Sequence, residues 1–136
     1  MNFVDTNILI YAFGQDDGSG RPDMAREIIG KGDLAFSIQV FQEFFFQATH
    51  KRRKEPLSSD EALEVITSLA AFPVQSNDLP LFREAVAIQK RFQTSFWDAN
   101  ILAAAKRLGC GVVYSEDLNA GQDFGGVSVV NPFTVK

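Results

Sequence analysis

This sequence has few of the residues that are typical of disulfide-bonded secreted proteins, of membrane proteins and of enzymes with a catalytic histidine. It contains a single histidine. Its 136 residues include one cysteine, Cys110, which excludes a disulfide within the chain and fits a reducing compartment. Cys110 lies among apolar residues, so we expect it to be a small buried hydrophobe. No uncharged apolar run approaches the roughly 18 residues of a membrane helix, and the first residues are not typical of a signal peptide. We therefore expect a cytoplasmic protein without a membrane segment.

Positive charge is not in excess either, since the formal net charge is −4. Taken alone, this charge argues against a polyanionic partner. The basic residues are clustered, however, at Lys51-Arg52-Arg53-Lys54, Lys90-Arg91 and Lys106-Arg107. Divalent cations bound at an acidic site would also cancel part of the negative potential. The charge balance therefore does not exclude RNA as a partner.

Hydrophobic residues, in contrast, make up 46% of the chain and include 13 phenylalanines. This composition predicts one packed domain over residues 1–136. We expect strands at 3–4, 34–38, 73–75, 111–114 and 127–130. We expect helices at 8–13, 22–29, 40–54, from 58 through 69, from 77 through 88, and at 96–108. Alternation of strands and helices predicts an α/β fold with a mostly parallel five-stranded sheet and helices on both faces.

Local signals place several of these helix ends. Ser58 and Glu61 form the pattern of a capping box, and Asn77 precedes a helix with Pro80 in its first turn. Ser95 is a good N-cap for the helix that carries Asp98 at its third position. The basic run Lys51–Lys54 would end helix 40–54, as the helix dipole favours.

Four acidic residues fall where the predicted elements meet one edge of the sheet. Asp5 follows the first strand and Asp117 follows the fourth, whereas Glu43 and Asp98 lie in the first turns of helices. Ligands of open parallel sheets bind at the carboxyl ends of the strands, where the strand order reverses. If the first and fourth strands are neighbours there, the four carboxylates converge. Their mutual repulsion would call for Mg²⁺ or Mn²⁺, which prefer oxygen ligands.

Such a site suits hydrolysis of phosphodiester bonds, because a bound cation lowers the pKa of a water molecule and stabilises the leaving oxygen. No serine, cysteine or histidine nucleophile is then needed. The four acids, Asp5, Glu43, Asp98 and Asp117, are therefore our candidate catalytic and metal-binding residues.

At these positions the sequence resembles the PIN domain family, particularly its VapC-like toxin ribonucleases. The resemblance is carried by Phe3-Val4-Asp5-Thr6-Asn7, Ser37-Ile38-Gln39-Val40 with Glu43, Ser95-Phe96-Trp97-Asp98-Ala99, and Tyr114-Ser115-Glu116-Asp117-Leu118. These segments follow the family's order and span nearly the whole chain.

The resemblance implies a Rossmann-like three-layer sandwich and a Mg²⁺- or Mn²⁺-dependent endoribonuclease that forms homodimers. It implies that Asp5, Glu43, Asp98 and Asp117 hold the metal, with Asn7 and Ser115 as polar supports. It also implies a small antitoxin partner, of which a planar arginine can reach the acidic pocket. Glu116 is an open alternative to Asp117 as the fourth acid.

Other interpretations of the same residues stay open. Asp5 also fits a turn cap, and Asp98 fits the acidic member of a capping box. Gln39, Gln47 and His50 share a polar stripe with Glu43, which we interpret as a possible substrate track. We expect His50 at the surface near the end of its helix. We expect Trp97 in the core rather than as a base-stacking platform, because buried aromatic residues outnumber stacking ones.

Lys51, Arg52, Arg53 and Lys54 fit either a solvated helix end or RNA backbone contacts. An aspartyl phosphatase or phosphorelay receiver is a weaker alternative, because no lysine follows a strand end where that chemistry needs one. A catalytically silent interaction module with the same fold is the remaining alternative.

Overall fold

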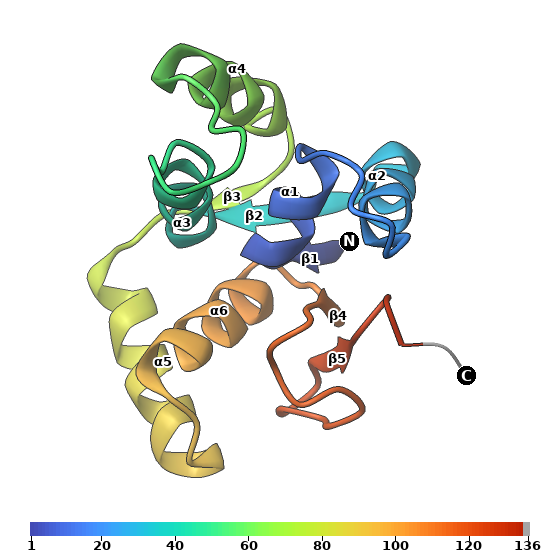
Figure 1. Ribbon diagram of the computed structural model, residues 1–136. Helices are drawn as coiled ribbons and strands as arrows, with labels where there is room; N and C mark the ends of the chain where they lie inside the picture. Colours follow the sequence, from blue (N-terminus) through green and yellow to red (C-terminus); the bar gives the residue numbers. More distant parts are fainter. Residues whose placement is uncertain (135–136) are drawn as a thin grey trace.

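A computed structural model describes residues 1–134, which form a five-stranded parallel sheet in the order β3-β2-β1-β4-β5 (Figure 1). The strands are β1 (Asn2–Val4), β2 (Leu34–Ser37), β3 (Val74–Gln75), β4 (Val112–Tyr114) and β5 (Ser128–Val130). The helices are α1 (Thr6–Ala12), α2 (Arg21–Lys31), α3 (Ile38–Ala48), α4 (Ser59–Leu69), α5 (Leu79–Phe92) and α6 (Phe96–Arg107). Every pairing between these strands is parallel.

The helices form a layer on each face of the sheet, with α1 to α4 on one side and α5 and α6 on the other (Figure 1). The chain steps from β1 to β2 to β3 in one direction, so right-handed crossovers place α1 to α4 on one face. It then returns past β1 to β4, which puts α5 and α6 on the opposite face. The predicted three-layer α/β sandwich is confirmed. Within residues 1–134, no helix is both long and apolar enough to cross a membrane.

Strands β1 and β2 lie in the middle of this sandwich, and most of their apolar side chains are buried. Phe3 and Val4 are fully buried, and all four residues of β2 are buried. A parallel strand covered by helices on both faces is expected to be apolar throughout. Cys110 is buried as predicted. The site therefore rests on a rigid central pair of strands.

Several helix boundaries differ from those predicted, and the largest difference is at the end of α3. Helix α3 begins at Ile38 and ends at Ala48, so the basic run lies in the turn after the helix rather than in its last turns. There the Arg52 N–H donates to His50 Nδ1 and the Leu57 N–H donates to the Ala48 carbonyl, which turns the chain toward α4. The prediction of a helix through residue 54 was wrong because these local turn bonds replace the helical ones.

Two further differences concern the N-terminal caps of α1 and α5. Helix α1 begins at Thr6, two residues early, because the Asp5 side chain accepts a hydrogen bond from the Thr6 N–H. Helix α5 is capped by Asp78, whereas the predicted cap, Asn77, contacts Gln42. The predicted capping box at Ser58 and the cap at Ser95 are confirmed. Both errors arise where two adjacent residues are each good caps.

A buried amide pair joins the first turns of α3 and α6. Asn100 Nδ2 donates to Gln39 Oε1 at 2.6 Å, and Gln39 Nε2 donates to the Trp97 carbonyl at 3.4 Å. Both side chains are buried. Because α3 carries Glu43 and α6 carries Asp98, this clamp sets how two of the predicted acids are placed relative to each other.

We expect Asn100→Ala to lower the free energy of unfolding by about 1–3 kcal/mol, because it leaves the buried Gln39 carbonyl oxygen without a donor. Urea unfolding measures this loss. The double variant Gln39→Leu/Asn100→Leu is the matched control and should recover part of the stability, since both polar partners are then replaced. A single variant as stable as wild type would show that the clamp does not hold the two helices.

Candidate active site

The site is built on the pairing of β1 with β4, which lie side by side although the chain visits them far apart. Val4 is in register with Tyr114, and the Asp5 N–H donates to the Tyr114 carbonyl at 3.0 Å. This point of the sheet is where the strand order reverses. The expectation that the first and fourth strands are neighbours is confirmed. Asp5 and Ser115 consequently leave the sheet side by side.

The carboxylate of Asp5 is held by two donors. Ser115 Oγ donates to Oδ2 at 2.8 Å, and the Thr6 N–H donates to Oδ1 at 2.7 Å. Burial nevertheless raises the pKa of Asp5 from 3.8 to about 6, and the negative charges of Glu43 and Asp117 add to the rise. The two hydrogen bonds lower it only in part. Asp5 therefore caps α1, as one interpretation predicted, and is also a destabilised buried acid.

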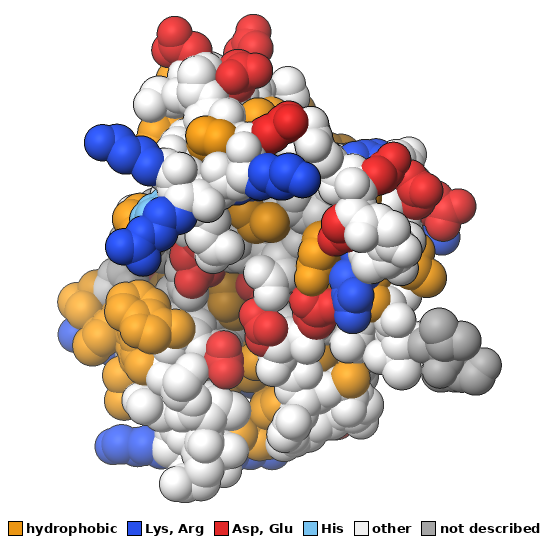
Figure 2. All heavy atoms as spheres, viewed as in Figure 1, with side chains coloured by type: hydrophobic (Ala, Val, Ile, Leu, Met, Phe, Trp, Pro, Cys, Tyr) orange, Lys and Arg blue, Asp and Glu red, His pale blue; other side chains and the backbone are white. Residues whose placement is uncertain are grey.

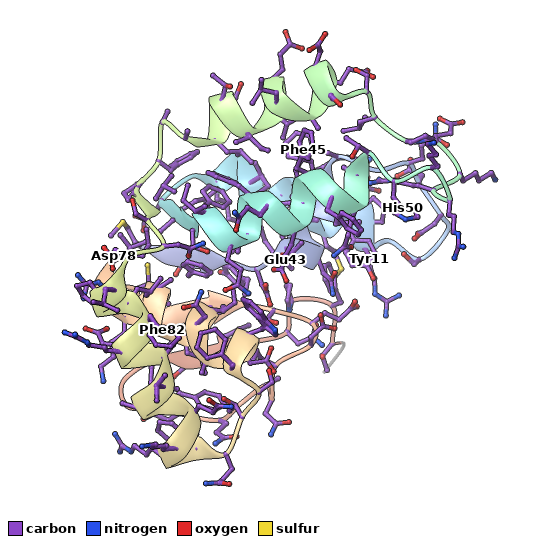
Figure 3. All side chains as sticks on the ribbon, turned by 90° about the vertical axis from the view of Figure 1, so that its left-hand side faces the viewer. Tyr11, Glu43, Phe45, His50, Asp78 and Phe82 are labelled. Carbon is purple, nitrogen blue, oxygen red and sulfur yellow. The ribbon has the colours of Figure 1, made fainter. Side chains whose placement is uncertain are left out.

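Thr6 connects Asp5 to Glu43. Its hydroxyl donates to Glu43 Oε1 at 2.7 Å, while its N–H holds Asp5. Glu43 thus faces the end of β1 from the middle of α3, and Figure 3 shows it on the side of α3 that faces α5 and α6. Sequence reasoning missed the role of Thr6. The signal was its place between Asp5 and Asn7, both of which the resemblance marks.

Asp117 is held by Asn7 and Ser115. Asn7 Nδ2 donates to Asp117 Oδ2 at 2.7 Å, and Ser115 Oγ accepts the N–H groups of Asp117 and Leu118 at 3.2 Å each. One buried serine hydroxyl therefore ties the loop after β4 to the carboxylate after β1. These contacts are those of the polar supports that the resemblance implied at Asn7 and Ser115.

Glu116 has a different environment from its neighbour Asp117. Its Oε1 accepts from Tyr11 Oη and its Oε2 from Arg21 Nε, each at 2.8 Å. Burial and the bond to Glu116 raise the pKa of Tyr11. Glu116 thus joins α1 and α2 to the loop after β4, and both of its oxygens are occupied by protein donors. This geometry favours Asp117 over Glu116 as the acid of the site.

Asp98 lies in the first turn of α6, where its N–H donates to Ser95 Oγ at 3.1 Å. Its position follows from the cap and from the amide clamp described above. Within residues 1–134, hydrogen bonds through Thr6, Ser115 and Asn7 connect Asp5, Glu43 and Asp117, and none connects the side chain of Asp98 to them. The structure thus brings Asp5, Glu43 and Asp117 together and leaves Asp98 at their margin.

The acids suit a hard cation by their chemistry, although they do not form a finished cage. Over residues 1–134, no three Asp, Glu, His or Cys side chains are arranged closely enough to hold a metal ion. None of the four acids takes part in an ion pair within those residues. Acidic side chains gather in the middle of the face in Figure 2, with basic ones above them. Carboxylate oxygens that lack a cationic partner are the ligand type that hard divalent cations prefer.

The predicted polar stripe on α3 divides into two parts. Gln47 and His50 are exposed, as expected for a surface stripe, but Gln39 is buried in the amide clamp. Periodicity alone did not show this because the first turn of α3 packs against α6. The idea of a continuous substrate track beginning at Gln39 is therefore wrong.

The basic run is also divided. Lys51, Arg52 and Lys54 are exposed, whereas the Arg53 guanidinium packs near Gly14 and its Nη1 is buried without a partner among the described residues. Arg53 borders a cavity of about 740 Å³ that is also lined by Tyr11 and Phe13. This cavity contains none of the four candidate acids.

Trp97 is exposed, which contradicts the expected core position. Its side chain is 64% exposed, and it packs edge-on against Phe96 with ring centroids 5.1 Å apart. Helix α6 buries Ala99 and the residues from Asn100 to Ala105 instead. The buried side chains of α6 begin at Ala99, so Trp97 in its first turn stays at the surface beside Asp98.

Comparison with known proteins supports the fold and the family. The model of the PIN domain matches residues 3–122. A toxin–antitoxin complex from Klebsiella pneumoniae contains a chain with 20% identity and a TM-score of 0.71, over 99% of this chain and 100% of that one. VapC20 of Mycobacterium tuberculosis, a toxin that cleaves the sarcin–ricin loop, has 21% identity and a TM-score of 0.70, over 86% and 90%.

FitAcB from Neisseria gonorrhoeae is similar over 99% of this chain and 100% of that chain, with 17% identity and a TM-score of 0.65. No curated protein matches the sequence. At these identities the solved structures establish the fold, whereas the family model spans most of the chain and includes Asp5, Glu43, Asp98 and Asp117. The chain belongs to the PIN domain family.

Proposed function

We propose that this protein is a Mg²⁺- or Mn²⁺-dependent endoribonuclease and the toxin of a toxin–antitoxin pair in the cytoplasm. The observation that carries the proposal is the group of Asp5, Glu43 and Asp117 around the end of β1. Burial and like charge raise the pKa of Asp5 to about 6, and no cation of the protein neutralises the group within residues 1–134. A perturbed acid that no cationic side chain neutralises is typical of sites that bind a charged ligand.

Asp5 and Asp117 would hold the cation most directly, with Glu43 and Asp98 completing the oxygen ligands from α3 and α6. When bound, the cation supplies an activated water and stabilises the charge of the leaving oxygen. Thr6 holds Asp5 and Glu43 in fixed directions, and Ser115 does the same for Asp5 and the Asp117 loop. This preorganisation reduces the rearrangement needed when substrate and metal arrive.

The central test is metal-dependent cleavage of single-stranded RNA by the purified protein. We expect cleavage with Mn²⁺ or Mg²⁺ and none in EDTA, and we expect Asp98→Asn to slow cleavage by orders of magnitude. End mapping of total RNA after incubation measures both. Asp60→Asn is a matched control, because it removes an exposed carboxylate from the first turn of α4. Full cleavage in EDTA would contradict the mechanism, and no cleavage under any condition would favour a silent interaction module.

The pKa of Asp5 predicts an unusual dependence of stability on pH without metal. Because the folded pKa of about 6 exceeds the ordinary 3.8, ionisation of Asp5 costs stability as the pH rises through this interval. Two pKa units correspond to at most about 3 kcal/mol. We therefore expect Asp5→Asn in EDTA to be more stable than wild type above pH 6 and to lose that advantage near pH 4.

Thermal melting between pH 4 and pH 8 measures the difference, and saturating Mn²⁺ should reverse the ranking because it stabilises the wild type by mass action. The exposed control Asp60→Asn should show neither effect. An Asp5→Asn variant that is less stable than wild type in EDTA at pH 8 would show that Asp5 acts mainly as a cap.

The partners we propose are single-stranded RNA, a small antitoxin and a second copy of this chain. Lys51, Arg52 and Lys54 are exposed where they can contact RNA phosphates, and Phe45 and Phe46 give α3 an exposed apolar side for a second copy. Expression beside its neighbouring genes should yield a complex in which cleavage is blocked, and sedimentation of the isolated chain should give a dimer. A monomer that no coexpressed small protein inhibits would contradict this part of the proposal and leave the nuclease intact.

A further inference from the structure

An exposed aromatic ledge, formed by Phe82, Phe96 and Trp97, lies next to the acidic site. Trp97 immediately precedes Asp98 and is 64% exposed, and Phe82 is 51% exposed. Phe96 lies between them, at 5.1 Å from the Trp97 ring and 5.6 Å from the Phe82 ring. The indole therefore packs along one side against a second ring.

The backbone beneath this ledge is also fixed. Gln39 Nε2 donates to the Trp97 carbonyl, and Gln39 in turn accepts from the buried Asn100. This places Trp97 at the beginning of α3, whereas Glu43 lies in the middle of that helix and Lys51 to Lys54 follow its end. At about 1.5 Å per residue, the helix from Gln39 to its last residue, Ala48, spans about 14 Å.

The three features thus lie in order along α3: the ledge, the acids and the basic turn. Figure 3 shows the same order, with Phe82 near one end of α3, Glu43 at its middle and His50 beyond the other end. Figure 2 shows hydrophobic side chains on one side of the acidic group and basic ones above it. A nucleic-acid strand that passes the acids would meet an aromatic ring on one side and cations on the other.

From this geometry we infer that Trp97 is a base-stacking subsite, which holds an unpaired base of the RNA next to the phosphate to be cleaved. The inference rests on the proposed nuclease function and adds a residue that positions the substrate. A rigid, exposed indole offers one face to any base, so it would favour single-stranded RNA without selecting a sequence. We infer RNA as the occupant because the ledge, the acids and the exposed Lys51, Arg52 and Lys54 follow one another along α3, as a nucleic-acid strand requires.

The test is binding of a single-stranded adenosine octamer RNA in Mg²⁺ by proteins that all carry Asp5→Asn, so that the RNA is not cut. Trp97 is the only tryptophan, so its fluorescence reports on this position alone. We expect saturable quenching of its emission. Adding Trp97→Ala should weaken binding roughly 5- to 150-fold, the range measured for loss of one stacked base, whereas Trp97→Phe should retain most of the affinity.

Two comparisons separate stacking from a structural effect. An octamer without bases should bind equally well to the protein with Trp97→Ala and to the protein that retains Trp97, because only its sugar–phosphate chain can make contacts. Trp97→Ala should leave the slope of affinity against salt unchanged, whereas Lys51→Glu/Arg52→Glu should flatten it, because only phosphate contacts release counterions. Leu63→Ala, which removes another exposed apolar side chain from α4, is the matched control and should change neither.

Unchanged RNA affinity in Trp97→Ala would overturn the inference, as would an equal loss of affinity for the octamer without bases. Tryptophan emission that is shielded from acrylamide before RNA is added, together with a change from dimer to monomer in Trp97→Ala, would also overturn it and assign the ledge to a second copy. Cleavage by the wild type in Mn²⁺ is scored separately, so failure of the subsite is distinguishable from failure of the nuclease function.

Discussion

The parallel pairing of β1 with β4 is the constraint on which the site depends. It brings the residue after each strand, Asp5 and Ser115, into hydrogen-bond contact although they are separated by 110 positions. A slip of one residue would move Phe3 and Val4, both fully buried, to the opposite helix layers, where the close packing is fitted to other side chains. The position of Asp5 is therefore fixed by the hydrophobic core and not by any attraction among the acids, which repel one another.

Short polar side chains then hold the acids in this unfavourable arrangement. Thr6 binds Asp5 and Glu43, Ser115 binds Asp5 and the backbone of Asp117, and Asn7 binds the side chain of Asp117. These donors are neutral, so they orient the carboxylates without cancelling their charge. The pKa of Asp5, about 6 in spite of two hydrogen bonds, shows that the charge is left uncompensated. Such a group gives up stability for the ability to bind a cation.

The arginine and lysine side chains of the α1–α2 region and of the turn after α3 lie outside this group of acids. Arg21 pairs with Glu116, and Arg26 pairs with Asp16 and Asp23, so these guanidinium groups serve the α1–α2 region. The exposed Lys51, Arg52 and Lys54 lie in the turn after α3. The two signs of charge are therefore separated along α3, an arrangement that fits the metal and RNA sites we propose. The net charge of −4 does not show that acidic and basic side chains lie apart on the surface.

The sequence by itself determined the α/β fold, the five strands and the caps at Ser58 and Ser95, because hydrophobic period and cap chemistry are local properties. It also singled out Asp5, Glu43, Asp98 and Asp117 as candidates and left Glu116 as an open alternative to Asp117. Tertiary structure alone decided that Glu116 is occupied by Tyr11 and Arg21, that Gln39 is buried against Asn100, and that Trp97 is exposed. Each of these depends on which helix packs against which. A single helix has several possible buried faces, and only its neighbours in space select one.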